Sequence, residues 1–130
     1  MPSKEITDLT PFLQRVFFNF RAWVKRVLHK DIVLVCAYRN VEEQQSEYAK
    51  GRTRPGKRTT NCDGVKNKSN HNYRPSRAFD FSFMVKGKLI WDKKWYDSCW
   101  LFFRQAKLTE KVRWGRNWKN FKDYPHIEEV

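Results

Sequence analysis

Acidic residues and cysteines are scarce in this sequence. The chain has 3 cysteines, an odd number without CxxC spacing, which argues against a disulfide scaffold and fits folding in a reducing cytoplasm. Only 14 acidic residues stand against 27 Lys and Arg, a formal net charge of +13. Such a surface attracts polyanions, whether nucleic acid, anionic lipid or an anionic cell envelope, and charge alone does not choose among them.

Long apolar runs and short catalytic motifs are also missing. The most apolar stretch, residues 12–28, is interrupted by four cations, so it is not predicted to span a membrane. Residues 1–5 show no signal-peptide pattern, and we therefore expect synthesis in the cytoplasm without an export signal. No HExxH motif is present, so any zinc site has to be assembled from distant residues.

The composition nevertheless predicts a folded domain with a substantial core. The chain has 130 residues, of which 40% are hydrophobic, with 10 Phe, 6 Trp and 5 Tyr. This length fits one domain, and no internal repeat, linker or low-complexity tail divides it. We expect a single domain over residues 1–130 without a second, separate module.

Local signals predict alternating helices and strands. Thr10-Pro11 is typical of a helix start, and apolar residues recur at helical spacing from there to Leu28. Residues 31–39 indicate a buried strand. Asn40 and Glu43 then form a capping-box pattern for a helix that ends at Gly51.

The second half begins with a long basic loop over residues 52–70, and a structureless loop of this length is usually functional. A strand over residues 78–85 and the following KLIWD segment flank Lys86-Gly87, which predicts a hairpin. A helical stripe covers residues 95–106, and two short strands at residues 112–115 and 126–130 close the chain. These elements predict an α+β domain.

A carboxylate between two phenylalanines is the first candidate for chemistry. Asp80 lies between Phe79 and Phe81, where burial is costly unless a partner compensates the charge. Either this is an edge strand whose aspartate faces water, or Asp80 and the preceding His71 hold a metal ion.

The segment DYPH near the C-terminus supplies the other candidates. Asp123 and His126 lie three residues apart, and together with His71 and Asp80 they offer a ligand set for catalytic zinc and a carboxylate base for its water. Arg39, at the end of the predicted strand, is placed to stabilise an oxyanion. Spacing alone leaves alternatives open: Asp123 as a solvated turn residue, and Arg39 as a cap or partner of a neighbouring acid.

Three ordered blocks strengthen one of these interpretations. The segments AYRNVEEQQSEYAKGRTRPG, SNHNY…RAFDF and WGRNWKNFKDYPHIE resemble the signature blocks of the M15 zinc peptidases. Within that family the resemblance is strongest to L-alanyl-D-glutamate endopeptidases, which occur among phage endolysins and bacterial wall hydrolases. It covers roughly residues 33–128, and three blocks in order are far more specific than one motif.

The resemblance implies a small α+β domain with a central antiparallel sheet and packed helices. It implies one zinc ion per chain, bound by His71, Asp80 and His126, with Asp123 as general base and Arg39 on the substrate carbonyl or transition state. Ser69 and Trp114 match positions that line the site.

The implied function is hydrolysis of peptidoglycan stem peptides at the L-Ala–D-Glu bond. The basic surface would hold the enzyme on anionic polymers of the cell envelope, with no obligate protein partner and as a monomer. For a phage endolysin, release to the wall would follow permeabilisation of the membrane by a holin-type protein.

The sequence departs from the family pattern at the first metal-binding block. The usual SxHxxGxAxD pattern places the aspartate seven residues after the histidine, whereas nine separate His71 from Asp80 here. Arg74-Pro75-Ser76 stands where a single glycine is usual, and we expect the loop to absorb the difference. Arg116 likewise replaces a common glycine.

Two other function classes remain open from the sequence. A basic nucleic-acid-binding protein or an HNH-like metal nuclease would suit the charge and the aromatic residues, but no standard nucleic-acid motif appears and the DYPH block would be unexplained. A wall-binding relative that lost activity through the insertion is the third possibility.

Overall fold

The computed structural model describes residues 2–120 and 122–130. Its centre is an antiparallel sheet of five strands in the order β1-β2-β5-β4, with β3 paired to β2. The strands are β1 (Asp31–Cys36), β2 (Ala78–Val85), β3 (Lys88–Ile90), β4 (Val112–Trp114) and β5 (His126–Glu129). The helices are α1 (Pro11–Trp23), α2 (Val41–Ala49), α3 (Lys93–Ser98) and α4 (Trp100–Gln105). Three short 3₁₀ turns cover Ile6–Asp8, Asn70–Asn72 and Gly115–Asn117.

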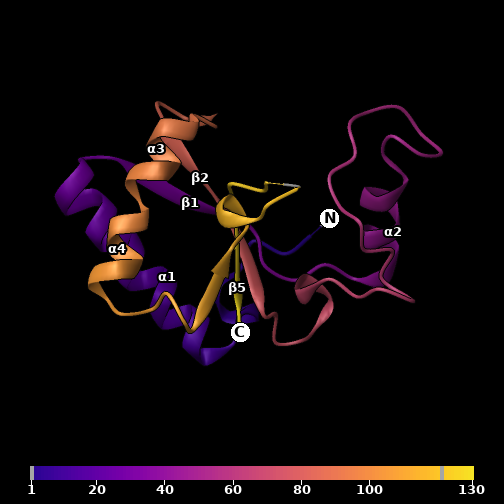
Figure 1. Cartoon of the computed structure of the whole chain (residues 1–130), viewed down its shortest axis with the longest axis horizontal. Helices are drawn as coiled ribbons and strands as arrows, with labels where there is room; N and C mark the ends of the chain where they lie inside the picture. Colours follow the sequence, from indigo (N-terminus) through magenta and orange to yellow (C-terminus); the bar gives the residue numbers. More distant parts are fainter. Residues whose placement is uncertain (1, 121) are drawn as a thin grey trace.

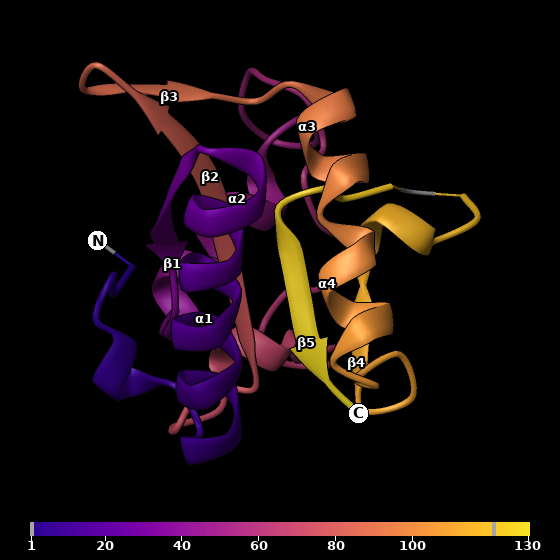
Figure 2. The same cartoon turned by 90° about the vertical axis from the view of Figure 1, so that its left-hand side faces the viewer.

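The helices divide between the two sides of the sheet. Figure 1 shows α1, α3 and α4 on one side, and α2 with the long loop that follows it on the other. In Figure 2, α1 and α4 lie in front of the strands. The α+β class and the antiparallel sheet with packed helices are thus confirmed. None of the helices in the described part of the chain combines the length and the hydrophobicity that spanning a bilayer requires.

Aromatic side chains fill the space between the sheet and α1, α3 and α4. Phe79, Phe81 and Phe83 of β2 are fully buried in one core cluster. The Phe81 ring packs 5.0 Å from Phe20 of α1 and 5.0 Å from Tyr96 of α3, measured between ring centroids. Such pairs add about 0.5–1.5 kcal/mol each beyond the burial of their surface. One face of β2 therefore packs into the core, and the other face is turned away from α1, α3 and α4.

Most of the predicted elements are confirmed. Thr10 caps α1, its side chain accepting from the Leu13 backbone N–H at 3.2 Å. Asn40 and Glu43 form the predicted capping box at the start of α2. The hairpin turns at Lys86-Gly87, both with positive φ, between β2 and β3.

Several element boundaries differ from the expectations, and three of them matter most. The α-helix from Pro11 ends at Trp23 and continues as a π-helical turn to Leu28. The helix expected over residues 95–106 is divided into α3 and α4. At the division, the Cys99 N–H donates to the carbonyls of Tyr96 and Asp97 and not to the carbonyl four residues earlier, as an α-helix would require. The first strand stops at Cys36 instead of reaching residue 39, after a register irregularity between Leu34 and Cys36.

The edge-strand interpretation of Asp80 is wrong. β2 has neighbours on both sides, and Asp80 is opposite Cys36 of β1 and His126 of β5. Since side chains alternate along a strand, Asp80 points away from the face that carries Phe79 and Phe81. Asp80 therefore lies in the middle of the sheet on the side of α2 and the long loop.

Candidate metal centre

Three chain segments bring His71, Asp80 and His126 together. Asp80 and His126 form a cross-strand pair of β2 and β5. His71 lies in the 3₁₀ turn Asn70–Asn72, which Ser69 begins: the Ser69 hydroxyl accepts from the His71 N–H at 3.3 Å, and Asn72 Oδ1 accepts from the Ser69 N–H at 2.8 Å. Ser69 thus fixes the turn that presents His71, and it also lines the cavity beside the cluster.

Three potential ligand atoms form a nearly equilateral triangle. His71 Nε2 lies 3.2 Å from Asp80 Oδ1 and 3.2 Å from His126 Nδ1, and the third side, His126 Nδ1 to Asp80 Oδ1, is 3.1 Å. Zinc–nitrogen bonds of about 2.0–2.1 Å in a tetrahedron place neighbouring ligand atoms about 3.3 Å apart. The triangle therefore has the dimensions that a tetrahedral zinc ion requires.

The outer nitrogens of both histidines have acceptors. His71 Nδ1 lies 2.8 Å from the Ala37 carbonyl oxygen, and His126 Nε2 lies 2.7 Å from Glu128 Oε1. Each outer nitrogen donates its proton there, so the inner nitrogens can present lone pairs beside the Asp80 carboxylate. Three acceptors pointing at one another repel unless a cation lies between them, and these residues therefore fit a metal ion.

The electrostatics of the cluster favour a positive charge at the same point. Although burial opposes its charged form, hydrogen bonds to Asp80 and Glu128 raise the pKa of His126 from 6.5 to about 10. Burial also opposes ionisation of Asp80, yet the two histidines hold the pKa of that carboxyl well below its usual range. A proton on Nδ1 of His126 would face Asp80 and His71, the same point at which a metal ion would lie.

Cys36 offers a different ligand set with His71 and Asp80, since one potential ligand atom of each lies within 4.8 Å of the others. Its Sγ, however, contacts Nδ1 of His71 at 3.6 Å, the nitrogen that already faces the Ala37 carbonyl. Burial and the charge of Asp80 raise the pKa of the Cys36 thiol to about 12, whereas metals bind the thiolate. The set with His126 is the better metal site.

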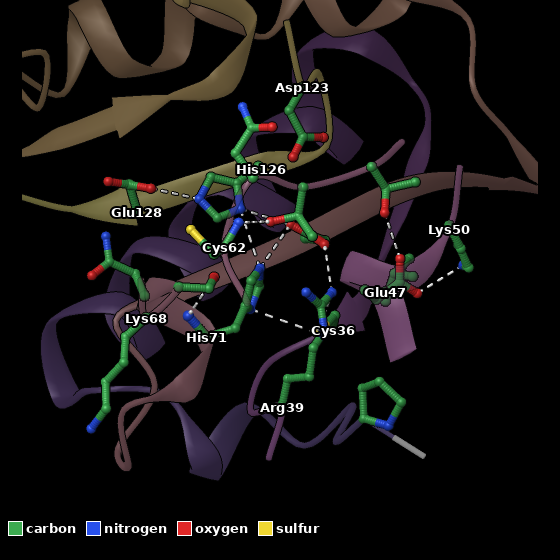
Figure 3. Close-up of a pocket in the computed structure, with 18 of the residues that line it drawn as sticks. Cys36, Arg39, Glu47, Lys50, Cys62, Lys68, His71, Asp123, His126 and Glu128 are labelled. Carbon is green, nitrogen blue, oxygen red and sulfur yellow. Dashed lines mark hydrogen bonds and ion pairs between the residues drawn. The ribbon is translucent and has the colours of Figure 1, made fainter. Parts of the chain in front are cut away.

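Asp123 stands next to this cluster without a hydrogen-bond partner for its carboxylate among the described residues. Burial and the charge of Asp80 raise the pKa of Asp123 from 3.8 to about 6, as expected for a carboxyl that would readily accept a proton. Its backbone is held by the Gly115 carbonyl at 3.0 Å and by the His126 N–H at 3.2 Å. In Figure 3, Asp123 lies beside His126, and Arg39 lies near Cys36 on the opposite side of the two histidines.

Arg39 approaches the cluster from the segment after β1. Its Nη2 lies 3.9 Å from Asp80 Oδ2 and 3.6 Å from Cys36 Sγ. Nη1 donates to Gln44 Oε1 at 2.9 Å, while Nε is buried without a partner in the described part of the chain. The guanidinium is thus available at the edge of the cluster.

Trp114 is placed differently from the expectation that it lines the site. Its side chain is buried in the core and is not part of the cavity wall. Its indole N–H donates to the Tyr124 carbonyl at 2.6 Å, which holds the loop that carries Asp123 and His126. Trp114 therefore supports the site from beneath instead of facing substrate.

A cavity of about 740 Å³ opens beside the cluster, between the sheet and the segments on the side of α2 (Figure 3). Its wall includes two side chains that the sequence analysis did not select, Glu128 and Trp118. Glu128 follows His126 by two residues in β5, so strand alternation alone places both on one face. The Trp118 ring packs 5.2 Å from His126 between centroids, a contact that no local pattern indicates.

Comparison with known proteins identifies the family of the chain. Residues 63–129 match the M15 peptidase family described as D-alanyl-D-alanine carboxypeptidase. The chain is 38% identical over 107 residues to the peptidoglycan L-alanyl-D-glutamate endopeptidase CwlK of Bacillus subtilis (strain 168). The alignment covers 77% of this chain and 61% of CwlK. The chain thus spans less than two thirds of the length of CwlK.

A solved structure gives the fold independently. The crystal structure of the Serratia marcescens L-Ala D-Glu endopeptidase ChiX aligns with a TM-score of 0.67 at 22% identity, covering 96% of this chain and 83% of that chain. The match over residues 63–129 includes His71, Asp80, Asp123 and His126. On this sequence match, and with a fold and a site that suit it, the chain belongs to the M15 peptidase family.

Proposed function

We propose that this chain is a zinc-dependent endopeptidase that hydrolyses peptidoglycan stem peptides at the L-Ala–D-Glu bond. The observation that carries the proposal is the triangle of His71 Nε2, Asp80 Oδ1 and His126 Nδ1. Beside it lies the carboxylate of Asp123, which has no hydrogen-bond partner among the described residues. The printed functions of CwlK and ChiX support the choice of bond. The nucleic-acid alternative has no support, since the family is one of peptidases.

His71, Asp80 and His126 would hold one zinc ion. Zinc bound in this way supplies a Lewis acid and lowers the pKa of its water to about 7. Asp123 accepts the proton of the attacking water, and its raised pKa matches it to that task. Arg39 donates from its guanidinium to the substrate carbonyl as negative charge develops there. Ser69 contributes by holding the turn of His71.

Charge complementarity supports an anionic substrate. Arg39 and Lys68 line the cavity, Lys50 pairs there with Glu47 at 2.8 Å, and the whole chain carries a formal +13. Stem peptides carry carboxylates and cell envelopes carry further anionic polymers, so the basic surface would concentrate the enzyme on the wall. We extend the proposal to a phage endolysin that reaches the wall after holin-type permeabilisation.

Digestion of purified peptidoglycan tests the proposed reaction. We expect mass spectrometry to find fragments with a new D-Glu amino terminus and muramyl chains ending in L-Ala. Chelated protein serves as the control. An inactive wall-binding protein would sediment with walls and release no such fragments, and cleavage at another bond would also contradict the assignment.

Glu128→Gln is expected to weaken zinc binding about 10- to 100-fold, the usual effect of removing the carboxylate behind a metal-bound histidine. The Glu128 carboxylate accepts from His126 Nε2 at 2.7 Å and thereby directs the lone pair of Nδ1 into the site. Zinc affinity is measured by competition with a chromophoric chelator. Glu129→Gln is the matched control, because its neighbouring carboxylate accepts instead from the Thr10 hydroxyl. Equal affinities for the two variants would show that Glu128 does not support the metal.

A further inference from the structure

Gln44 is the one side chain of α2 that is completely buried. An amide in this position is costly unless its donors and acceptor are satisfied. Its Oε1 accepts from Arg39 Nη1 at 2.9 Å and from Asn72 Nδ2 at 3.4 Å. Its Nε2 donates to the Cys62 carbonyl at 2.8 Å and to the Thr60 hydroxyl at 3.4 Å. These hydrogen bonds satisfy the buried amide and connect it to Arg39, to Asn72 and to the long loop.

The first connection is to the guanidinium of Arg39. Among the residues that the structure describes, the bond from Gln44 is the shortest contact of that group, since Cys36 Sγ is 3.6 Å away and Asp80 Oδ2 is 3.9 Å away. The Arg39 side chain is only 12% exposed, so water does little to hold it. In the described part of the chain no other contact of the guanidinium is as short, so loss of Gln44 would let the group move toward Asp80.

The second connection is to the long loop that forms one wall of the cavity. Thr60 and Cys62 line the cavity, and Gln44 bonds to both. The backbone of Gly64, with φ of +84°, lies so close that a Cβ there would be 3.0 Å from Gln44 Cβ. The loop is thus seated directly on Gln44.

A third contact ties in the turn of His71. Asn72, the next residue, donates to the Arg39 carbonyl at 2.8 Å as well as toward Gln44. The Arg39 N–H in turn donates to the His71 carbonyl at 2.9 Å. The guanidinium, the loop wall and the turn of His71 therefore meet at one buried amide.

We propose that Gln44 is a positioning residue: its carbonyl oxygen sets the guanidinium of Arg39 for the reaction, and its amide nitrogen seats the loop wall of the substrate cavity. The inference rests on the proposed function, in which Arg39 acts on the substrate carbonyl. Gln44 acts through Arg39 and does not itself touch the reacting atoms. Released from Gln44, Arg39 would close its 3.9 Å separation from Asp80 and be drawn away from the substrate.

A double-mutant cycle separates positioning from a structural effect. Arg39→Ala is expected to lower kcat about 100- to 1,000-fold, and Gln44→Leu about 10- to 100-fold, the size of effect that a misplaced group causes. If Gln44 acts through Arg39, Gln44→Leu costs almost nothing further in kcat once Arg39 is alanine. Zinc content and Tm are measured in parallel, and Gln45→Leu on the exposed side of α2 is the matched control. Independent, multiplying effects of the two substitutions would overturn the proposal.

The variant Gln44→Glu tests the contact with Arg39 separately from the contact with the loop wall. It keeps an acceptor for Arg39 but loses the donor to the Cys62 carbonyl, so we expect kcat to stay within a few-fold of the wild-type value while KM rises. A purely structural Gln44 predicts instead that Gln44→Glu and Gln44→Leu lose kcat in proportion to their loss of Tm.

A spectroscopic readout does not depend on activity. In ¹⁵N-labelled protein, the bond to Gln44 is expected to slow rotation of the Arg39 guanidinium and give a resolved Nη signal, identified by its loss in Arg39→Ala. That signal should persist in Gln44→Glu and collapse in Gln44→Leu. Its persistence in Gln44→Leu would overturn the positioning role even if the peptidase assignment holds, and its collapse in an inactive protein would support the role when the assignment fails.

Discussion

His126→Ala is expected to abolish zinc binding and wall hydrolysis together. It removes one corner of the ligand triangle and leaves His71 and Asp80, a pair that we do not expect to retain zinc against a chelator. Elemental analysis after dialysis against chelator and assay on purified walls measure both effects. Wild-type protein treated in the same way should recover on addition of zinc, whereas the variant should not.

The same substitution should uncouple thermal stability from zinc. A ligand that binds only the folded state raises stability with its concentration, so the Tm of the wild-type protein should rise with zinc and that of His126→Ala should not. His29→Asn is the control, because His29 is an exposed histidine in the left-handed region that asparagine tolerates. One zinc ion bound to His126→Ala, with walls still hydrolysed, would contradict the ligand assignment.

Asp123→Asn is expected to retain zinc and fold while turnover falls about 100- to 10,000-fold, the usual effect of removing a general base. The Asp123 carboxylate has no hydrogen-bond partner in the described residues, so an amide of the same size breaks none. The substitution also removes a negative charge that burial and the neighbouring Asp80 disfavour, as the raised pKa of Asp123 shows. Stability should therefore be unchanged or slightly higher.

Zinc content, Tm and rate of wall lysis are measured together for this variant. Asp97→Asn is the control, since that aspartate lies on α3 and pairs with Arg116 at the surface. If Asp123 were only a solvated turn residue before Pro125, asparagine would be an easy replacement and lysis would proceed at the wild-type rate. That result, with zinc bound, would refute Asp123 as the base.

The sequence was sufficient where a signal is local. Asn40 with Glu43, Thr10 with Pro11, and Lys86-Gly87 each predict a cap or turn from adjacent residues, and each is found. The ligand candidates were different, because His71, Asp80 and His126 are far apart along the chain. Their residue types offered them as one possible ligand set, and the family resemblance was needed to single that set out. The structure places them together despite the longer spacing after His71.

The longer spacing is accommodated by contacts with the N-terminal segment. Ser76 is buried, donates its N–H to the Asp8 carbonyl at 2.7 Å and accepts from the Thr10 N–H at 3.1 Å. The added residues thus bridge to a distant part of the chain instead of pushing Asp80 away from His71. Such compensation depends on tertiary contacts that no local pattern contains.

Gln44 and Gln45 show the same limit most clearly. They are identical in type and adjacent in α2, yet one is fully buried and the other is exposed. Trp114 was expected to face the cavity for a similar reason: its place in the WGRNW segment does not tell which side of β4 meets the core. Helix propensity and position in a motif do not determine the direction in which a side chain points.

The cross-strand pairing of Asp80 with His126 also restricts how this protein can evolve. Phe79 and Ile127, their chain neighbours, face the core from the opposite side of the same strands. A shift of β2 or β5 by one residue would turn the ligands into the core and the core into the cavity. We therefore expect insertions to be tolerated in the loop between His71 and Ala78 but not within the strands. Natural variation should refine the rim of the cavity by substitution while the strands keep their length.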